Sequence, residues 1–529
     1  MKVALLALSA KNTHKTLAPW CLKAYCDAHV EGVECVVLEY TINDSLTDIL
    51  DGIFAEKPNV LGLSCYIWNV ETVAKIVECV RQILPQCKII LGGPEVRATG
   101  VDGIVCDYFV QGAGEERFVE ILDELGVGGR RRAVGSWITD PSPYTDKFFE
   151  SFSLGRMGGI QNQLVYYESS RGCPFLCSYC VSSLTEGVEY LPVARVLHDL
   201  DLFVEKGAVC VKFVDRTFNA DKKRAAKILQ HVQNMYTTCT FHFEVTGDLF
   251  DDELFCLIER MPKGRVQFEI GVQSTNEETL VAINRKTDID KVLRNVKRIV
   301  DYGNTHIHLD LIAGLPHETL ASFKCGVDCC LSAKPHMLQL GVLKILKNTR
   351  LRQEADKYGY VYSEFPPYRV LATETLSFSD MSEIRAVTQV AEKFYNSGLY
   401  ANSMLYAMEL LGGYRALNAL AEFCRGTNIK ASLKKSYMLL HEFLQTYGNT
   451  ALAEHYVKLD CLTYDPKGQL PDAIQPRRDK SAEAEYRKER KMANVRVEYF
   501  ELTGETMLFD YSERDAVTKA CKVLRCDAR

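Results

Sequence analysis

Apolar and polar positions alternate with two different periods along the first 130 residues. Short apolar runs predict buried strands, and the longer stretches between them repeat apolar residues at the spacing of an amphipathic helix. The predicted strands cover residues 3–8, 35–40, 60–64, 88–91 and 108–111, and the predicted helices cover 16–28, 45–55, 70–84 and 115–125. Strands and helices that alternate in this way form a parallel, doubly wound α/β sheet of flavodoxin-like type. Such sheets bind ligands beyond the carboxyl ends of their strands, so the loops there are candidate binding loops.

A second alternation of strands and helices runs from residue 166 to about residue 370. Strands are predicted at 164–168, 210–214, 240–245, 265–270, 306–312 and 339–345. Parallel strands joined by helices predict a (β/α) barrel of TIM type, or part of one, with its site at the carboxyl ends of the strands. The candidates at those ends are mostly polar residues and glycines: Asp215, Arg216, Thr217, Asn219, Glu244, Thr246, Glu269, Gly271, Gln273, Ser274, Asp310, Gly314, Leu315 and Pro316. Each of them could instead cap or hydrogen-bond a neighbouring strand.

The remaining segments complete a division into four parts. Residues 131–165 carry an arginine triplet, prolines and glycines that interrupt the periodicity, which predicts an interdomain linker. Residues 371–529 show amphipathic helical patterns and end in a predicted pair of strands at 495–501 and 505–510. We therefore predict domains at 1–130 and 166–370, a linker at 131–165, and a mainly α-helical C-terminal domain at 371–529.

Composition narrows the class of protein. Of the 529 residues, 47% are hydrophobic and 25% are charged, and this composition is typical of a globular protein. Its net charge of -6 gives no general attraction for nucleic acid or acidic membranes, and no apolar run reaches the length of a membrane span. Twenty cysteines without a secretory signal favour a reducing compartment. We expect a cytoplasmic, monomeric protein that binds neither membrane nor nucleic acid.

Three cysteines follow the first predicted barrel strand at C-x3-C-x2-C spacing. Cys173, Cys177 and Cys180 lie within eight residues, so one loop can direct three sulfurs to a common metal centre. A zinc knuckle would need a fourth ligand at a familiar spacing, and none follows. A cubane iron-sulfur cluster held by three thiolates keeps one iron open, where chemistry can occur.

Two glycine-containing loops follow successive strands of the first region. They are Gly92-Gly93-Pro94-Glu95 and Gln111-Gly112-Ala113-Gly114-Glu115. Glycine lets the backbone approach a large flat or phosphate-bearing ligand, although tight turns between strand and helix also use it. Together the two loops favour a ligand at this edge of the sheet.

The cysteine loop, with an aromatic residue before its last cysteine, resembles the signature of the radical S-adenosylmethionine (SAM) superfamily. The resemblance implies that Cys173, Cys177 and Cys180 hold a 4Fe-4S cluster whose open iron is chelated by SAM. It implies that Tyr179 lies near the adenine and that Asp215, in Phe213-Val214-Asp215-Arg216, meets the methionine amino group. It also implies that two further segments lie near the ribose and adenine: Gln273 with Ser274, and Ile312 to Gly314.

The first region resembles the cobalamin-binding domain that precedes some radical SAM enzymes. The resemblance places several loop residues around cobalamin: Asn12, His14, Ser64, Tyr66, Gly92, Gly93, Pro94, Glu95, Gly112, Gly114 and Glu115. Many cobalamin carriers ligate cobalt with the histidine of an Asp-x-His-x-x-Gly loop. Here the loop reads Asn12-Thr13-His14-Lys15-Thr16-Leu17, without the aspartate that would orient the imidazole. We therefore expect His14 to line the pocket and not to ligate cobalt.

The two resemblances together imply a cobalamin-dependent radical SAM enzyme. The related methyltransferases methylate an unactivated carbon or phosphorus centre of a small molecule or peptide, by way of a 5'-deoxyadenosyl radical and methylcobalamin. A flavodoxin- or ferredoxin-type protein is the expected reductant, and no residue is assigned as a catalytic acid or base. Three alternatives remain: a related enzyme that performs a cyclisation, ring contraction or redox step without methyl transfer, a cobalamin-binding sensor or carrier, and a radical methylthiotransferase acting on RNA.

Overall fold

The computed structural model describes residues 1–127, 129–130, 137–139, 141–154, 158–185, 187–429 and 432–526. The chain divides into two compact units. Unit 1 consists of Met1–Glu244, Ile283–Arg285 and Lys344–Val370, and unit 2 consists of Val245–Ala282, Lys286–Leu343 and Leu371–Arg529. None of the helices in the described ranges is long and apolar enough to cross a membrane.

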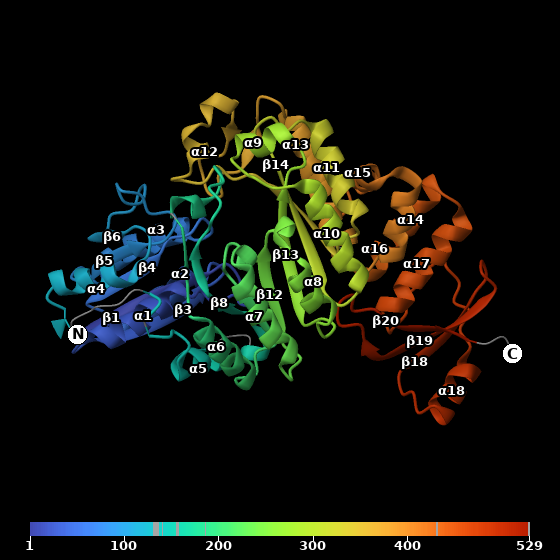
Figure 1. Ribbon diagram of the computed structural model, residues 1–529, viewed down its shortest axis with the longest axis horizontal. Coiled ribbons are helices and arrows are strands. Elements are labelled where there is room, and N and C mark those ends of the chain that lie inside the picture. Colours follow the sequence, from blue (N-terminus) through green and yellow to red (C-terminus); the bar gives the residue numbers. More distant parts are fainter. Residues whose placement is uncertain are drawn as a thin grey trace. The chain divides into compact units, whose positions relative to one another are not determined.

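Unit 1 begins with a five-stranded parallel sheet, coloured blue in Figure 1. Its strands are β1 (Lys2–Ser9), β3 (Glu34–Thr41), β4 (Val60–Ser64), β5 (Lys88–Gly92) and β6 (Tyr108–Val110), in the spatial order β3-β1-β4-β5-β6. Counted along the chain this order is 2-1-3-4-5, the flavodoxin-like order, in which ligands bind where the strand order reverses. The predicted sheet is confirmed.

The apolar strands of this sheet are buried on both faces. Alternate residues of β1 enter different cores: Ala4, Leu6 and Leu8 join one, and Val3 and Leu5 join the other. Helices α2 (Leu46–Glu56) and α3 (Val70–Ile83) contribute to the first core, whereas α1 (Ala18–His29) and α4 (Glu115–Glu124) contribute to the second. Continuous apolar runs therefore appear in the sequence because helices cover both faces of a parallel sheet.

Unit 1 also contains three parallel strands from the predicted barrel. They are β8 (Val165–Tyr167), β11 (Cys210–Phe213) and β12 (Thr240–Val245), with α6 (Val193–Glu205) and α7 (Lys222–Asn234) between them along the chain. The hairpin of β9 (Ser170–Gly172) and β10 (Val188–Tyr190) flanks the cysteine loop. Residues 344–370 of the same unit include α12 (Arg350–Gln353) and β16 (Val361–Tyr362).

Unit 2 contains the other parallel strands predicted for the barrel. They are β13 (Val266–Gln273), β14 (His306–Ala313) and β15 (Met337–Val342). The helices of this part are α8 (Asp252–Glu259), α9 (Glu277–Ala282), α10 (Ile289–Tyr302) and α11 (Leu320–Ser332). The prediction of parallel strands separated by helices is confirmed.

The C-terminal part of unit 2 is mainly helical, as predicted. Its long helices are α13 (Phe378–Val390), α14 (Ala401–Leu411), α15 (Gly413–Phe423), α16 (Leu433–Tyr447), α17 (Thr450–Tyr464) and α18 (Lys480–Glu489). The predicted strand pair exists as β18 (Val495–Phe500) and β19 (Glu505–Arg514), and β20 (Cys521–Arg525) extends it to an antiparallel sheet of three strands.

Parts of the predicted linker at 131–165 lie outside the described residues, namely 131–136, 140 and 155–157. Its described part contains helix α5 (Asp146–Leu154), whose Phe148 and Phe152 are buried. The predicted boundaries at 130, 165 and 370 stay predictions.

Candidate cofactor sites

The cysteine loop is anchored at both ends by backbone contacts within unit 1. Gly172, directly before Cys173, has φ 93°, and a β-carbon there would lie 2.2 Å from the carbonyl oxygen of Gly187. Only glycine permits this close approach. Farther along, the N–H of Ser178 donates to Ile283 (3.0 Å), and the carbonyl of Ser178 accepts from Leu351 (2.9 Å). The loop that carries the sulfurs is therefore held by three separate segments of the chain.

Each of the three sulfurs has a polar neighbour. The Sγ of Cys173 lies 3.6 Å from the hydroxyl of Thr217, and that of Cys180 accepts the N–H of Ser182 at 3.4 Å. The Sγ of Cys177 lies 3.9 Å from the Arg285 guanidinium. Burial raises the pKa of the Cys177 thiol, and Arg285 partly opposes that shift. A positive group beside this sulfur favours the thiolate that a metal requires.

The three sulfurs do not have the close spacing that a zinc ion requires. Tetrahedral zinc with Zn–S bonds of about 2.3 Å would bring its sulfurs to about 3.8 Å from one another. Among the described residues, the group of three candidate ligands whose atoms all lie within 4.8 Å of one another does not include these cysteines. The three thiols are therefore not all as close to one another as a single zinc ion requires, and the larger body of a 4Fe-4S cluster does not need them to be.

Asp215 supports the start of the cysteine loop. Its fully buried carboxylate accepts the N–H groups of Ser169 (2.7 Å) and Ser170 (2.9 Å), together with the Ser169 hydroxyl. Arg224 donates to the Ser169 carbonyl at 3.0 Å. Burial raises the pKa of Asp215, and the Ser169 hydrogen bonds and Arg224 counteract the rise. These bonds indicate a positioning role for Asp215, and its contact with the SAM amino group stays a prediction.

The aromatic residue of the motif, Tyr179, is partly buried beside the cysteines. Burial raises the pKa of its hydroxyl, so this group stays protonated at neutral pH. Its placement near adenine stays a prediction.

The first loop of the cobalamin-binding region lies against a barrel strand. The N–H of Leu164 donates to the Thr13 carbonyl (3.0 Å), and the His14 imidazole meets the Tyr166 ring edge-to-face at 5.8 Å. Burial lowers the pKa of His14, and Lys11 and Lys212 lower it further, so its imidazole is neutral at pH 7. Asn12 is exposed at the tip of the same loop.

The end of β4 is built around a buried asparagine. The Asn69 side chain donates to the carbonyls of Leu8 (3.1 Å) and Ser64 (3.0 Å) and accepts the Tyr66 N–H (2.8 Å). The Tyr66 ring stacks on Trp68 with centroids 4.3 Å apart. Burial raises the pKa of Tyr66 to about 12. The ends of β1 and β4, where the strand order reverses, thus present a flat aromatic surface.

The glycines of the two strand-end loops have different reasons for being glycine. Gly93 has φ 101°, and a β-carbon there would lie 2.6 Å from the Cys65 carbonyl oxygen. Gly112 has φ 74° but faces open space, and a β-carbon on Gly92 would make only an ordinary contact. Gly114 is the residue before α4. Close packing of the protein itself therefore explains Gly93, whereas the surroundings of Gly112 leave room for a ligand.

Glu95 is engaged by a distant segment of unit 1. Its buried carboxylate accepts the Tyr368 hydroxyl at 2.6 Å and lies 3.5 Å from the Lys347 ammonium. Lys347 also pairs with Asp102 at 3.3 Å. Burial and the Glu95 carboxylate raise the pKa of Tyr368. Glu95 therefore joins the loop after β5 to residues 344–370, while the neighbouring Pro94 is exposed.

An ion triad joins the cobalamin-binding region to the cysteine loop. Arg171, two residues before Cys173, donates to Glu115 at 2.6 Å and to Glu168 at 3.0 Å. All three side chains are largely buried, and they line a small cavity with Cys21 and Trp137. Burial raises the pKa of Glu168, and Arg171 opposes the rise. No pattern in the sequence indicated this contact, although Glu115 was among the predicted residues.

The predicted SAM segments of unit 2 lie at the ends of β13 and β14. Gln273 adopts φ 70°, next to a register shift in β13, and its buried side-chain oxygen makes no hydrogen bond to a described residue. Ser274 is buried and accepts the Asn276 N–H at 3.0 Å. Ile312 is half-buried in β14, and Gly314 follows it with φ 90°. The backbone of Gln273 is thus strained, and its buried side-chain oxygen is placed at a strand end, where it could accept a hydrogen bond from a polar ligand such as a ribose.

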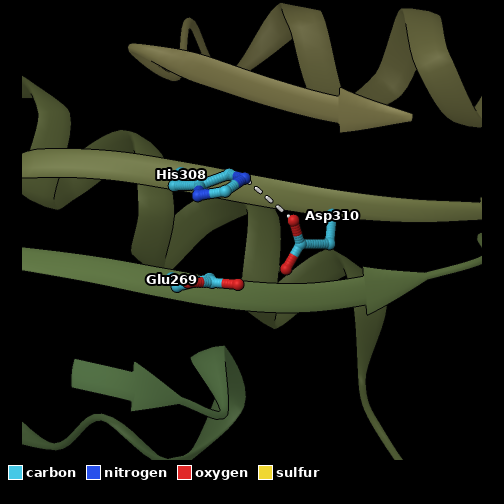
Figure 2. A group of neighbouring side chains, drawn as sticks. All are labelled: Glu269, His308 and Asp310. Carbon is cyan, nitrogen blue, oxygen red and sulfur yellow. Dashed lines mark ion pairs between the residues drawn. The ribbon is translucent and has the colours of Figure 1, made fainter. Parts of the chain in front are cut away.

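Unit 2 also contains a cluster of three polar side chains that the sequence pattern predicted only in part. Glu269 of β13 and His308 and Asp310 of β14 bring one ligand atom each to within 4.8 Å of one another (Figure 2). Glu269 and Asp310 were candidates as strand-end residues, but His308 was not. Polar residues at every second position of an otherwise apolar strand, namely His306, His308 and Asp310, indicate a polar face and could have pointed to His308.

Comparison with known families agrees with this geometry. The family model of the B12 binding domain matches residues 3–122, and that of the radical SAM superfamily matches 167–324. The chain is a cobalamin-binding radical SAM enzyme. Its cofactors are accordingly a 4Fe-4S cluster, SAM and cobalamin. A family described as a protein of unknown function (DUF4080) matches residues 356–520 of this radical SAM enzyme.

Two curated proteins are similar to much of the chain. The 2-(S-pantetheinyl)-carbapenam-3-carboxylate methyltransferase of Streptantibioticus cattleyicolor is 25% identical over 84% of this chain and 71% of its own length. The cobalamin-dependent radical SAM methyltransferase TokK of Streptomyces tokunonensis is 25% identical over 59% of this chain, and the match spans only 50% of TokK.

Solved structures share the fold at low sequence identity. The match to the cobalamin-dependent SAM radical enzyme OxsB covers 87% of this chain and 79% of the OxsB chain, with a TM-score of 0.55 and 14% sequence identity. The radical SAM methyltransferase TsrM from Kitasatospora setae has a TM-score of 0.53 and 17% identity, over 68% of this chain and 77% of its own.

Proposed function

We propose that this protein is a methyltransferase that uses cobalamin and a SAM-derived radical to methylate an unactivated carbon or phosphorus centre of a small molecule or peptide. The contact of Arg171 with Glu115 carries the proposal. It connects the edge of the cobalamin-binding sheet directly to the loop of Cys173, as expected of two cofactors that serve one reaction. Two similar curated proteins bear methyltransferase names.

The cofactors would be held by residues at the strand ends. When bound, the cluster supplies the electron that cleaves SAM, and cobalamin supplies the methyl group. Cys173, Cys177 and Cys180 would hold three irons, with Arg285 stabilising the Cys177 thiolate. Hydrogen bonds and charges at the sulfurs tune the potential of such a cluster.

The residues proposed for SAM act by orientation. Gln273 would offer its buried side-chain oxygen to a ribose hydroxyl, with Ser274, Ile312 and Gly314 forming the adjoining wall. Tyr179 would lie near the adenine. Asp215 holds Ser169 and Ser170 and thereby fixes the strand that leads into the cysteine loop.

The residues proposed for cobalamin form the edge of the five-stranded sheet. Tyr66 and the backbone of Gly92, Gly93 and Gly112 would contact the corrin, with Asn12, Ser64, Pro94 and Gly114 at the rim. His14 packs on Tyr166 and would line the pocket without ligating cobalt. Glu95 and Glu115 would shape the pocket by fixing Tyr368 and Arg171. We further propose a cytoplasmic monomer that receives electrons from a flavodoxin- or ferredoxin-type protein.

The proposal is tested with reconstituted protein and SAM carrying a labelled methyl group. Cluster and cobalamin are restored anaerobically, a cell extract supplies substrate, and products are followed by mass spectrometry. We expect labelled methyl in a small molecule or peptide together with 5'-deoxyadenosine. Deoxyadenosine without methyl transfer would contradict the proposal and identify an enzyme that performs a cyclisation, ring contraction or redox step.

A further inference from the structure

Three polar side chains of unit 2 meet on one face of two adjacent parallel strands, β13 and β14. Residues Glu269 and His308 are register partners, and so are Gly271 and Asp310. Because successive side chains of a strand point to opposite faces, His308 and Asp310 lie on the same face, two residues apart. Figure 2 shows the three side chains together over the paired strands β13 and β14, with a dashed line from His308 to Asp310.

The three side chains offer the donor set of a metal site. One imidazole nitrogen and two carboxylate oxygens all lie within 4.8 Å of one another. The His308 Nε2 and the Asp310 Oδ1 are 2.9 Å apart. Adjacent ligands of an octahedral ion with bonds of about 2.1 Å are separated by about 3.0 Å, so this pair already has the spacing of two metal ligands. The ligand oxygen of Glu269 lies within 4.8 Å of both of these atoms, close enough for Glu269 to be the third ligand.

Charge and burial favour a cation at this position. His308 is 5% exposed, and the side chain of Asp310 is 15% exposed. Two carboxylates held together away from water repel each other, and a bound cation offsets the repulsion. One imidazole with two carboxylates suits Mn²⁺, Fe²⁺ or Zn²⁺, whereas Ca²⁺ and Mg²⁺ prefer oxygen ligands alone.

We propose that Glu269, His308 and Asp310 bind one divalent transition-metal ion, in addition to the iron of the cluster and the cobalt of cobalamin. Three protein ligands leave coordination positions open, as in catalytic metal sites. The open positions would accept oxygen atoms of a bound ligand, such as a carboxylate or hydroxyl group of the substrate. In the proposed methyltransferase, the metal ion would help to bind an oxygen-containing substrate. The metal site itself is inferred only from the geometry of the three side chains and does not depend on the proposed function.

Manganese binding tests the proposal without any enzymatic assay. Full-length protein is treated with chelator, and Mn²⁺ is added while the six-line electron paramagnetic signal of free Mn²⁺ is recorded. Mn²⁺ prefers oxygen and nitrogen ligands, so the cysteine loop does not compete for it. We expect the wild-type chain to remove one equivalent of free Mn²⁺. The isosteric variants Glu269→Gln and Asp310→Asn, and His308→Ala, should each weaken binding at least tenfold.

A matched control comes from the same strand. His306 lies two residues before His308, stacks on His336 with centroids 5.0 Å apart, and does not belong to the group of three. The variant His306→Ala should bind Mn²⁺ like the wild type. Circular dichroism and cobalamin binding verify that each variant is folded.

A second measurement extends the test to zinc. The triple variant Cys173→Ala, Cys177→Ala, Cys180→Ala removes the three thiolates of the cysteine loop, and its Zn²⁺ content after dialysis is measured by mass spectrometry. We expect about one Zn²⁺ per chain, lost on adding His308→Ala. The proposal is overturned if the chain binds neither ion at millimolar concentration, or if binding is unchanged in the His308→Ala, Glu269→Gln and Asp310→Asn variants.

Discussion

At the scale of single residues, Cys177 gives the sharpest test of the cluster. It is the most buried of the three cluster cysteines, and Arg285 lies beside its sulfur. The Cys177→Ala variant should lose the iron–thiolate absorbance of the 4Fe-4S cluster, at about 400 nm, and should no longer cleave SAM. Both losses are expected because two thiolates cannot hold the cubane. The exposed Cys256 of α8 provides the control, and Cys256→Ala should retain both properties. Cleavage of SAM by Cys177→Ala would contradict the cluster assignment.

Arg171 is the second residue whose removal has a defined consequence. The Arg171→Gln variant leaves the carboxylates of Glu115 and Glu168 largely buried without their cation. We expect the free energy of unfolding of unit 1 to fall by about 1–3 kcal/mol, because an uncompensated charge pair is costly. Urea denaturation measures the change.

The Glu115→Gln variant separates the contribution of this ion pair. In a double-mutant cycle, Arg171→Gln and Glu115→Gln should couple by at least about 0.5 kcal/mol, because they contact each other directly. Additive effects of the two substitutions would show that the pair contributes no interaction energy.

At the scale of elements, the two strand-end loops differ in how they tolerate a side chain. A β-carbon on Gly93 meets the Cys65 carbonyl at 2.6 Å, while one on Gly112 meets nothing within 4 Å. Both substitutions by alanine strain a left-handed backbone, at about 1 kcal/mol. Gly93→Ala adds the collision, so it should displace the end of β4 and weaken cobalamin binding, measured from the visible spectrum, at least tenfold more than Gly112→Ala. Equal effects would contradict this difference.

Helix limits in the C-terminal part illustrate what local pattern misses. The amphipathic pattern predicts one helix over 400–425, but the structure has α14 and α15, with Gly412 at φ 88° between them. The N–H of Tyr414 donates to the Asp328 carboxylate of α11 at 2.6 Å, so tertiary contact fixes the start of α15. The apolar periodicity continued across the break because both helices bury a face.

At the scale of the whole chain, a salt bridge within unit 2 links the barrel strands to the C-terminal sheet. Asp515, beyond β19, pairs with Lys263, just before β13, and also accepts the N–H groups of Val517 and Thr518. Burial alone raises the pKa of Asp515, but Lys263 and these N–H groups outweigh it and lower that pKa to about 2. The carboxylate is therefore more acidic in the folded protein than in the unfolded chain.

The lowered pKa sets the pH dependence of stability. The contribution of Asp515 is fully present above its unfolded pKa of about 4 and is lost as the pH falls toward 2. Asp515→Asn should therefore lower the free energy of unfolding at pH 7, measured by urea denaturation, by about 1–2 kcal/mol. The difference from wild type should shrink as the pH falls from 4 to 2. Asp472→Asn, which removes an exposed pair with Lys434, should show little difference at either pH. A constant difference across this range would exclude the ion pair as its source.

The sequence by itself determined the elements and the cysteine site. Strands such as β4 and β5 were found nearly to the residue, because strands buried on both faces leave continuous apolar runs that need no tertiary information. Cys173, Cys177 and Cys180 were found because the ligands of the cluster lie within one short loop. The glycine loops after β5 and β6 were likewise local signals.

Only the tertiary structure decided which side chains meet across the chain. Asp215 is engaged by residues 45 and 46 positions away, and Glu95 is engaged by Tyr368, 273 positions away. The approach of His308 to Glu269 depends on the register of β13 against β14. Such pairs leave no periodic trace in the sequence, because the packing of separate elements, and not the pattern within any one of them, brings their polar atoms together.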